Sequence, residues 1–134
     1  MQIKTNILSP LSPEQTSFSK NVYLTISEGL ISEISSEPSE SFQDLSDLIC
    51  IPGLIDAHVH LSQFHARGKH STNLLSWLND HIFAEELRSK DESYAHHIAI
   101  DFFQDLLAAG TTTAVIYTSP FKTACDLARA KLDK

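Results

Sequence analysis

Cysteine is scarce in this chain, which contains Cys50 and Cys125 and no others among its 134 residues. The two lie far apart in the sequence, and neither belongs to a Cys-x-x-Cys pair. The pattern indicates neither a disulfide framework nor a thiolate zinc site. We therefore expect a reducing, cytoplasmic location.

Long apolar runs are missing as well. No stretch approaches the roughly 18 apolar residues that a membrane span needs, and the amino terminus lacks the basic segment and apolar core of a signal peptide. Acidic residues outnumber basic ones by 17 to 10, which gives a formal net charge of −7 and disfavours binding to nucleic acid or an anionic membrane. We expect a soluble, unexported protein whose partner is a small molecule.

Two catalytic signatures are also absent. One is the His-x-Glu and Pro-Cys-x-x-Cys combination of one class of zinc deaminases. The other is the Gly-x-Ser-x-Gly nucleophile elbow of serine hydrolases. The sequence therefore supports neither of these two mechanisms.

The composition is typical of a globular protein. With 42% hydrophobic and 20% charged residues, a packed core is expected. Residues 22–26 and 30–34 alternate apolar with polar side chains around a short segment ending in Gly29, where glycine can supply the positive φ of a tight turn. This predicts a β-hairpin with one buried face. Segments 9–13 and 35–41, rich in proline and serine, are predicted loops.

Strand and helix patterns alternate in the rest of the chain. The predicted elements are a strand over Leu54–His60, helices over 74–83 and 93–109, a strand over 111–118 and a helix over 121–132. The longest helix carries an apolar stripe at the 3.6-residue period, made of Ala95, Ile98, Ala99, Phe102, Leu106 and Leu107. Gly110 marks its end, and Ser119 followed by proline predicts the N-cap of the last helix.

This order of elements predicts a parallel α/β sheet or barrel. Two strands cannot close a barrel, which takes about 200 residues or more, so we expect the chain to be truncated at its carboxyl end. Residues 1–51 would form an amino-terminal β segment, and residues 52–134 the first two βα units of an incomplete barrel.

Two histidines on one strand are the clearest candidate ligands. Alternation along Leu54–His60 places Asp56, His58 and His60 on one face, near the carboxyl end where active sites of parallel α/β barrels lie. Two neutral imidazoles there can bind one divalent cation, which would lower the pKa of a bound water and make a hydroxide nucleophile. The alternative is a pair of ordinary exposed or core histidines.

The string Pro-Gly-Leu-Ile-Asp-Ala-His-Val-His at residues 52–60, after a β-rich leader, resembles the signature of the amidohydrolase superfamily. Downstream, the chain is similar to guanine deaminases at residues 61–64 and 74–79, at Phe83, Glu85 and Glu86, and over the segment 106–113 with its Ala-Gly-Thr-Thr-Thr. Ala84 departs from that family, which commonly has proline there. The resemblance covers about 85 residues from Ile49 onward.

The resemblance implies a zinc-dependent deaminase, with another divalent metal as an alternative, that converts guanine and water to xanthine and ammonia. His58 and His60 would bind the metal, and Gln63 would bind the purine, since an amide offers both a donor and an acceptor; an exposed loop glutamine is the alternative. The family's remaining ligands, two histidines and an aspartate on later strands, and its acidic proton shuttle lie beyond residue 134. A composite β-sandwich beside a (β/α)8 barrel and a homodimeric complete enzyme are further implications.

Two other residues have structural and functional interpretations. Asp56 could orient a ligand histidine or satisfy backbone groups, and we favour the first because metal-bound histidine usually has such a partner. Trp77 lies on an amphipathic helix, where core packing is the expected role and a wall for the base the alternative. The other histidines have no spacing that matches the pair.

Two rival interpretations remain open. Within the enzyme class, the substrate could be another purine, a pterin or a triazine that an amidohydrolase deaminates or dechlorinates. In a different class, the chain could be a non-catalytic remnant or a truncated gene product. The fragment alone, lacking later ligands, is expected to be inactive.

Overall fold

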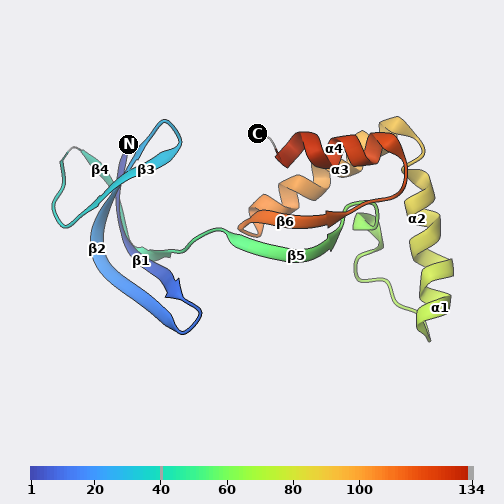
Figure 1. The fold of residues 1–134 in the computed structure, drawn as a ribbon, viewed down its shortest axis with the longest axis horizontal. Helices are drawn as coiled ribbons and strands as arrows, with labels where there is room; N and C mark the ends of the chain where they lie inside the picture. The colour runs from blue at the N-terminus through green and yellow to red at the C-terminus, as the bar shows by residue number, and fades with distance from the viewer. Residues whose placement is uncertain (40, 133–134) are drawn as a thin grey trace. The chain divides into compact units, whose positions relative to one another are not determined.

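The computed structural model describes residues 1–39 and 41–132, with the backbone alone described for 130–132. The chain divides into two compact units, Met1–Pro52 and Gly53–Lys134, each of which is visible in Figure 1. Glu40, part of a predicted loop, lies outside the described residues.

The first unit is a four-stranded sheet in the order β3-β2-β1-β4. Its strands are β1 Gln2–Ser12, β2 Gln15–Ser27, β3 Leu30–Ser35 and β4 Phe42–Cys50. Strand β2 is antiparallel to both of its neighbours, whereas β4 runs parallel to β1. Strands β3 and β4 are the edges of this sheet, and their outer sides pair with no further strand within the described residues of this unit.

The predicted hairpin is confirmed as β2 and β3. Ser27 pairs with Leu30 across a two-residue turn, and both turn residues have positive φ, 52° at Glu28 and 78° at Gly29. This is the type I′ geometry that matches the twist of the flanking strands. The expected buried face is found on β2 at Leu24. It does not extend to β3, whose apolar side chains Leu30, Ile31 and Ile34 are exposed.

The prediction of a loop over residues 9–13 was wrong, because β1 runs through to Ser12. Pro10 pairs with Thr16 of β2, and the register shifts before Ser12. On its other side β1 pairs with β4 only as far as Ile7. Pro10 therefore lies where the strand has a free edge, and there proline's missing N–H costs no ladder hydrogen bond.

The second unit is built on the parallel strands β5 (Leu54–His60) and β6 (Thr111–Tyr117), as predicted. Helices α3 (Glu92–Ala108) and α4 (Lys122–Leu132) pack together on this sheet (Figure 1). The buried core consists of Leu61, Phe64, Ile98, Ala99, Phe102 and Ala128, with Val59 and Ile116 packed against it from the strands.

Helix α3 confirms the strongest helical prediction. The Asp91 carboxylate caps it by accepting a hydrogen bond from the Tyr94 N–H at 2.8 Å, and Gly110 follows its end with φ of 82°. Most of the predicted stripe is buried, including Ile98. Leu107 is the exception, with 66% of its surface exposed.

The predicted helix over 74–83 is longer and less regular than expected. It comprises α1 (Leu74–Trp77), a π-helical turn η2 (Leu78–Ile82) and α2 (Phe83–Arg88), preceded by the short η1 (Phe64–Ala66). The helix continues through Ala84 because alanine, unlike proline, keeps its N–H and does not obstruct the preceding turn.

The predicted N-cap of the last helix was wrong. Helix α4 begins at Lys122, and the buried Ser119 hydroxyl has no hydrogen-bond partner among the described residues. Two residues, Pro120 and Phe121, separate Ser119 from the first helical residue. The serine is therefore too far upstream to cap the helix, because a cap must immediately precede the first turn.

Candidate metal and substrate site

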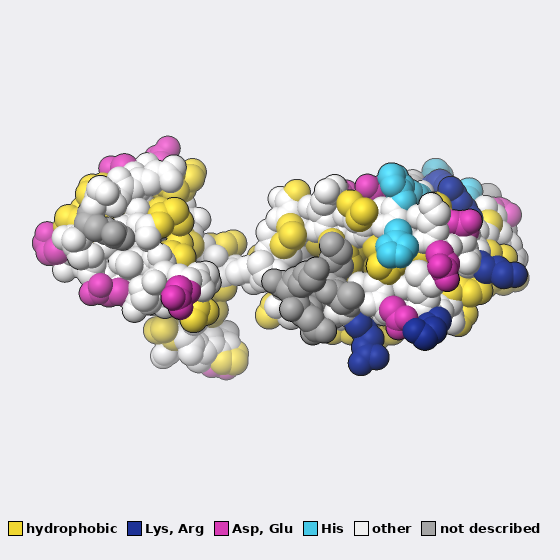
Figure 2. Space-filling view, turned by 90° about the horizontal axis from the view of Figure 1, so that it is seen from above, with side chains coloured by type: hydrophobic (Ala, Val, Ile, Leu, Met, Phe, Trp, Pro, Cys, Tyr) yellow, Lys and Arg dark blue, Asp and Glu magenta, His cyan; other side chains and the backbone are white. Residues whose placement is uncertain are grey.

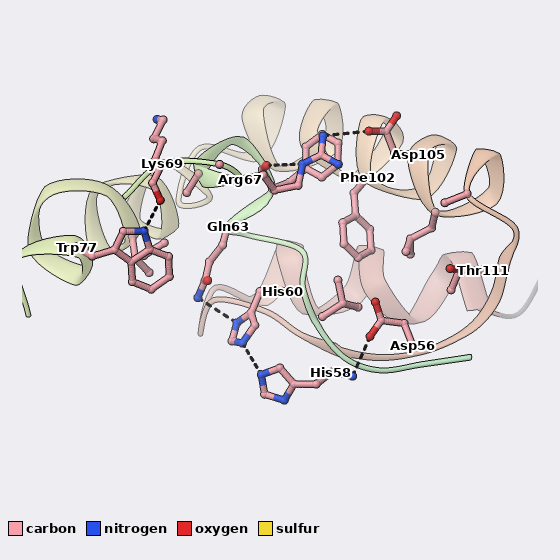
Figure 3. Close-up of a pocket in the computed structure, with 17 residues that line it drawn as sticks. Asp56, His58, His60, Gln63, Arg67, Lys69, Trp77, Phe102, Asp105 and Thr111 are labelled. Carbon is pink, nitrogen blue, oxygen red and sulfur yellow. Dashed lines mark hydrogen bonds and ion pairs between the residues drawn. The ribbon is translucent and has the colours of Figure 1, made fainter. Parts of the chain in front are cut away.

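His58 and His60 bring their side chains together at the carboxyl end of β5 (Figure 3). Their Nε2 atoms are 3.1 Å apart. Two nitrogens bound to one tetrahedral zinc ion are separated by about 3.3 Å, given Zn–N distances of about 2.0–2.1 Å. The two imidazoles therefore fit a shared cation. No cluster of three or more candidate ligands occurs in the described part of the chain, so it offers two of the ligands that a catalytic zinc needs.

Tyr117, which the sequence analysis did not single out, packs on both imidazoles. It pairs with His60 across the parallel strands, and its ring is stacked on that of His60 with centroids 5.2 Å apart. The distance from its centroid to that of His58 is 4.5 Å. The sequence could have indicated Tyr117 as an aromatic residue at the carboxyl end of the next strand. Its packing restrains both imidazole rings.

Asp56 does not share a face with the two histidines, contrary to the alternation argument. Asp56 pairs with Ala114, and Val59 pairs with Ile116. An advance of three residues along β5 therefore corresponds to two residues along β6. This bulge turns Asp56 away from His58 and His60, toward α3 (Figure 3). Val59 packs against the core that includes Ile98 and Phe102 of the same helix.

The Asp56 carboxylate accepts a hydrogen bond from the backbone N–H of His58 at 3.0 Å. It thus accepts from a backbone donor at the bulge, and no hydrogen bond from an imidazole ring to this carboxylate is found within the described residues. This was the less favoured of the two roles expected for it. Through the backbone, the contact helps to fix the position of His58.

Gln63 reaches back from the segment after β5 toward the histidine pair. Its Nε2 lies 3.0 Å from His60 Nδ1 and donates a hydrogen bond to Glu86 Oε1 at 2.8 Å. Glu86 belongs to α2 and is half-buried. Sequence reasoning included Glu86 in the resemblance but gave it no role, because no local pattern relates it to a residue 23 positions earlier.

A cavity of about 470 Å³ contains these side chains. His58, His60 and Gln63 line it together with Trp77 (Figure 3). The Trp77 ring is half-buried, and its Nε1–H donates to the Lys69 carbonyl at 2.8 Å. The tryptophan therefore lies at the cavity with its one polar atom satisfied, so its ring presents an apolar surface to a ligand.

A separate ionic cluster joins α2 to α3. The Glu85 side chain is 7% exposed; it accepts hydrogen bonds from Arg88 Nη1 at 3.2 Å and from the Tyr94 hydroxyl. Burial and the neighbouring Glu85 carboxylate raise the pKa of Tyr94. His65 lies 3.1 Å from the Tyr94 hydroxyl. These groups tie the two helices together away from the histidine pair.

The sequence is similar to several known proteins. Over 102 residues it is 37% identical to a probable guanine deaminase of Deinococcus radiodurans, which covers 76% of this chain and 23% of that protein. The guanine deaminase of Escherichia coli is 37% identical over 75 residues, or 56% of this chain and 17% of that enzyme. A 5'-deoxyadenosine deaminase of Methanobrevibacter smithii is 34% identical over 112 residues, which are 80% of this chain and 25% of that protein. The chain thus spans about a quarter or less of these relatives.

Solved structures of guanine deaminases are also similar to this chain. A guanine deaminase from C. acetobutylicum with guanine bound in its active site superposes with a TM-score of 0.83 at 26% identity, covering 98% of this chain and 33% of that one. The enzyme from Bradyrhizobium japonicum gives a TM-score of 0.85 at 27% identity, covering 98% and 32%. The family model described as "Amidohydrolase family" matches residues 49–132. The paired histidines, the parallel strands that carry them and these similarities show that the chain belongs to the amidohydrolase family.

Proposed function

We propose that this chain supplies the first metal ligands and a base-binding residue of a guanine deaminase. The observation that supports this proposal most directly is that His58, His60 and Gln63 line one cavity. The Nε2 atoms of the two histidines are 3.1 Å apart there. The guanine deaminases among the similar proteins, one of which was solved with guanine in its active site, support the choice of substrate.

The proposed architecture is a (β/α)8 barrel beside a small β-sandwich. Strands β5 and β6 would be its first two barrel strands, and the first unit would be the amino-terminal part of the sandwich. The parallel pairing of β5 with β6 and the helices that cover one face support this assignment. Further metal ligands would come from later strands.

His58 and His60 would hold zinc or another divalent cation through their neutral Nε2 atoms. When bound, the metal would activate water for attack on the carbon that bears the exocyclic amine of guanine. Gln63 would hydrogen-bond the purine, and Trp77 would cover part of the base with its ring. Asp56 would hold the His58 backbone through its carboxylate, and Tyr117 would restrain both imidazoles by packing on them.

The test uses a completed enzyme in which residues 1–134 replace the aligned segment of the E. coli guanine deaminase. We expect this completed enzyme to bind zinc and to release ammonia from guanine. 5'-Deoxyadenosine, a pterin and an aminotriazine serve as competing substrates. A metal-loaded enzyme that prefers one of these over guanine would overturn the substrate assignment, and one that acts on none would favour a non-catalytic remnant.

A further inference from the structure

Glu86 lies next to the proposed site without being part of the cavity wall. Its carboxylate accepts the hydrogen bond from Gln63 Nε2 at 2.8 Å, but the cavity is lined by Gln63 and not by Glu86. No cationic side chain pairs with Glu86 within the described residues. Gln63 is therefore the group through which Glu86 can influence a ligand.

The carboxylate sets which end of the Gln63 amide faces it. A side-chain amide has a donor end and an acceptor end, and an ionised carboxylate only accepts. If the amide were turned around, its carbonyl oxygen would face a carboxylate oxygen, and two acceptors would repel each other. The donor end is therefore directed to Glu86, and the same nitrogen lies beside His60 Nδ1.

This leaves the carbonyl oxygen of Gln63 for a ligand. Oε1 makes no hydrogen bond among the described residues, while Nε2 has two neighbours. We propose that Glu86 is a positioning residue that fixes Gln63 with its oxygen toward the cavity, so that the site selects a purine presenting a ring N–H donor at that edge. The inference rests on the proposed function.

Guanine meets this requirement, since its ring carries N–H groups besides the amine that is removed. A purine that presents an unprotonated ring nitrogen at the same edge would place an acceptor against an acceptor. Such an unpaired contact in a closed site discriminates more strongly than a small difference in shape. Glu86 would thus contribute to specificity without touching the substrate.

The experiment compares Glu86→Gln with Glu86→Lys in the completed enzyme. In Glu86→Gln the new amide can face Gln63 with either end, so both orientations of the Gln63 amide become accessible and kcat/KM for guanine should fall only about 2- to 5-fold. In Glu86→Lys the new ammonium group is a donor and should turn the Gln63 amide around, lowering kcat/KM about 10- to 100-fold. Zinc content should be unchanged in both. Glu92→Lys, the same charge reversal on the exposed start of α3, is the matched control.

Two further measurements make the test decisive. In a Gln63→Ala background, Glu86→Lys should cost no additional activity, because its effect passes through the missing amide. In enzyme labelled with ¹⁵N-glutamine, Glu86→Gln should shift the side-chain amide signals of Gln63, and Glu92→Lys should not. Multiplicative losses in the double variant, or unmoved Gln63 signals, would overturn the positioning role. If the completed enzyme does not deaminate guanine, the proposed function fails, but the amide signals still decide whether Glu86 orients Gln63.

Discussion

At the scale of single residues, the proposed site would separate metal binding from substrate recognition. His58 would contribute a ring nitrogen to the metal, whereas Gln63, whose amide lines the same cavity, would bind the purine. In the completed enzyme, we expect Gln63→Ala to leave zinc content intact and to lower kcat/KM for guanine about 10- to 100-fold, the effect of losing roughly 1–3 kcal/mol of hydrogen bonding. His58→Ala should remove both metal and turnover.

Zinc content and kcat/KM are measured in both variants, and we expect Gln63→Ala to lose only activity whereas His58→Ala loses both. A general folding defect would depress both quantities in either variant. If Gln63→Ala keeps the full kcat/KM for guanine, Gln63 is an ordinary loop residue and the choice of guanine loses its main support, although the metal-hydrolase assignment does not.

The 134-residue chain alone should bind zinc weakly. It offers two imidazoles, and no cluster of three or more candidate ligands is found in the described ranges; a catalytic zinc usually has three protein ligands. Calorimetric titration of the purified chain with zinc measures this directly, with His58→Ala as the comparison. Tight, stoichiometric binding that disappears in His58→Ala would contradict the view that the site needs further ligands.

At the scale of secondary-structure elements, the contact between α2 and α3 depends on the protonation state of Tyr94. Its hydroxyl donates to the buried Glu85 carboxylate, and its pKa is raised by burial and by that carboxylate. The pKa of an unfolded tyrosine is about 10. Because the folded-state pKa is higher, the stabilising contribution is fully present below about pH 10 and is lost as the pH rises through the folded-state pKa.

We expect Tyr94→Phe to reduce the free energy of unfolding of the completed enzyme by about 1.5–3 kcal/mol at neutral pH, since it removes a hydrogen bond to a charged group. The difference from the unmodified enzyme should shrink above about pH 10. Urea unfolding between about pH 7 and 11 measures it. Tyr23→Phe is the control, because the Tyr23 ring packs edge-on against Phe42, a contact that the variant keeps. A difference that grows with pH would refute the proposed hydrogen bond.

At the scale of the whole molecule, apolar side chains are exposed in both units, as the yellow surface in Figure 2 shows. In the first unit Leu30 is 71% exposed, and in the second Ile55 and Leu107 are 73% and 66% exposed. Strands β5 and β6 form a two-stranded sheet whose outer edges have no partner strand in the described residues. Such open edges and apolar patches promote association.

We expect the chain alone to aggregate, to bind a hydrophobic dye or to have loose tertiary packing. Sedimentation, dye fluorescence and thermal unfolding measure these properties. A monomer with a sharp cooperative transition and dispersed NMR signals would show instead that the 134 residues form a self-sufficient domain. Within the described ranges, none of the helices has the length and hydrophobicity that crossing a membrane requires.

The sequence by itself determined the features that depend on near neighbours. The apolar stripe of α3 depends on residues a few positions apart, and so does the turn of the hairpin at Gly29. The placement of His58 and His60 two residues apart on one strand is equally local. Alternation and helical periodicity follow from backbone geometry, which is why the hairpin, β5 and α3 could be predicted, although alternation failed at Asp56 where β5 bulges.

Tertiary structure decided the features that depend on pairing between distant segments. The bulge in β5 exists because its register is matched to β6, and it moved Asp56 to the face opposite His60. Pro10 is accommodated in β1 because β4 stops pairing before it. The contact of Glu86 with Gln63 arises only when α2 folds back beside the end of β5. No local periodicity encodes such contacts, since their partners meet only after the chain has packed.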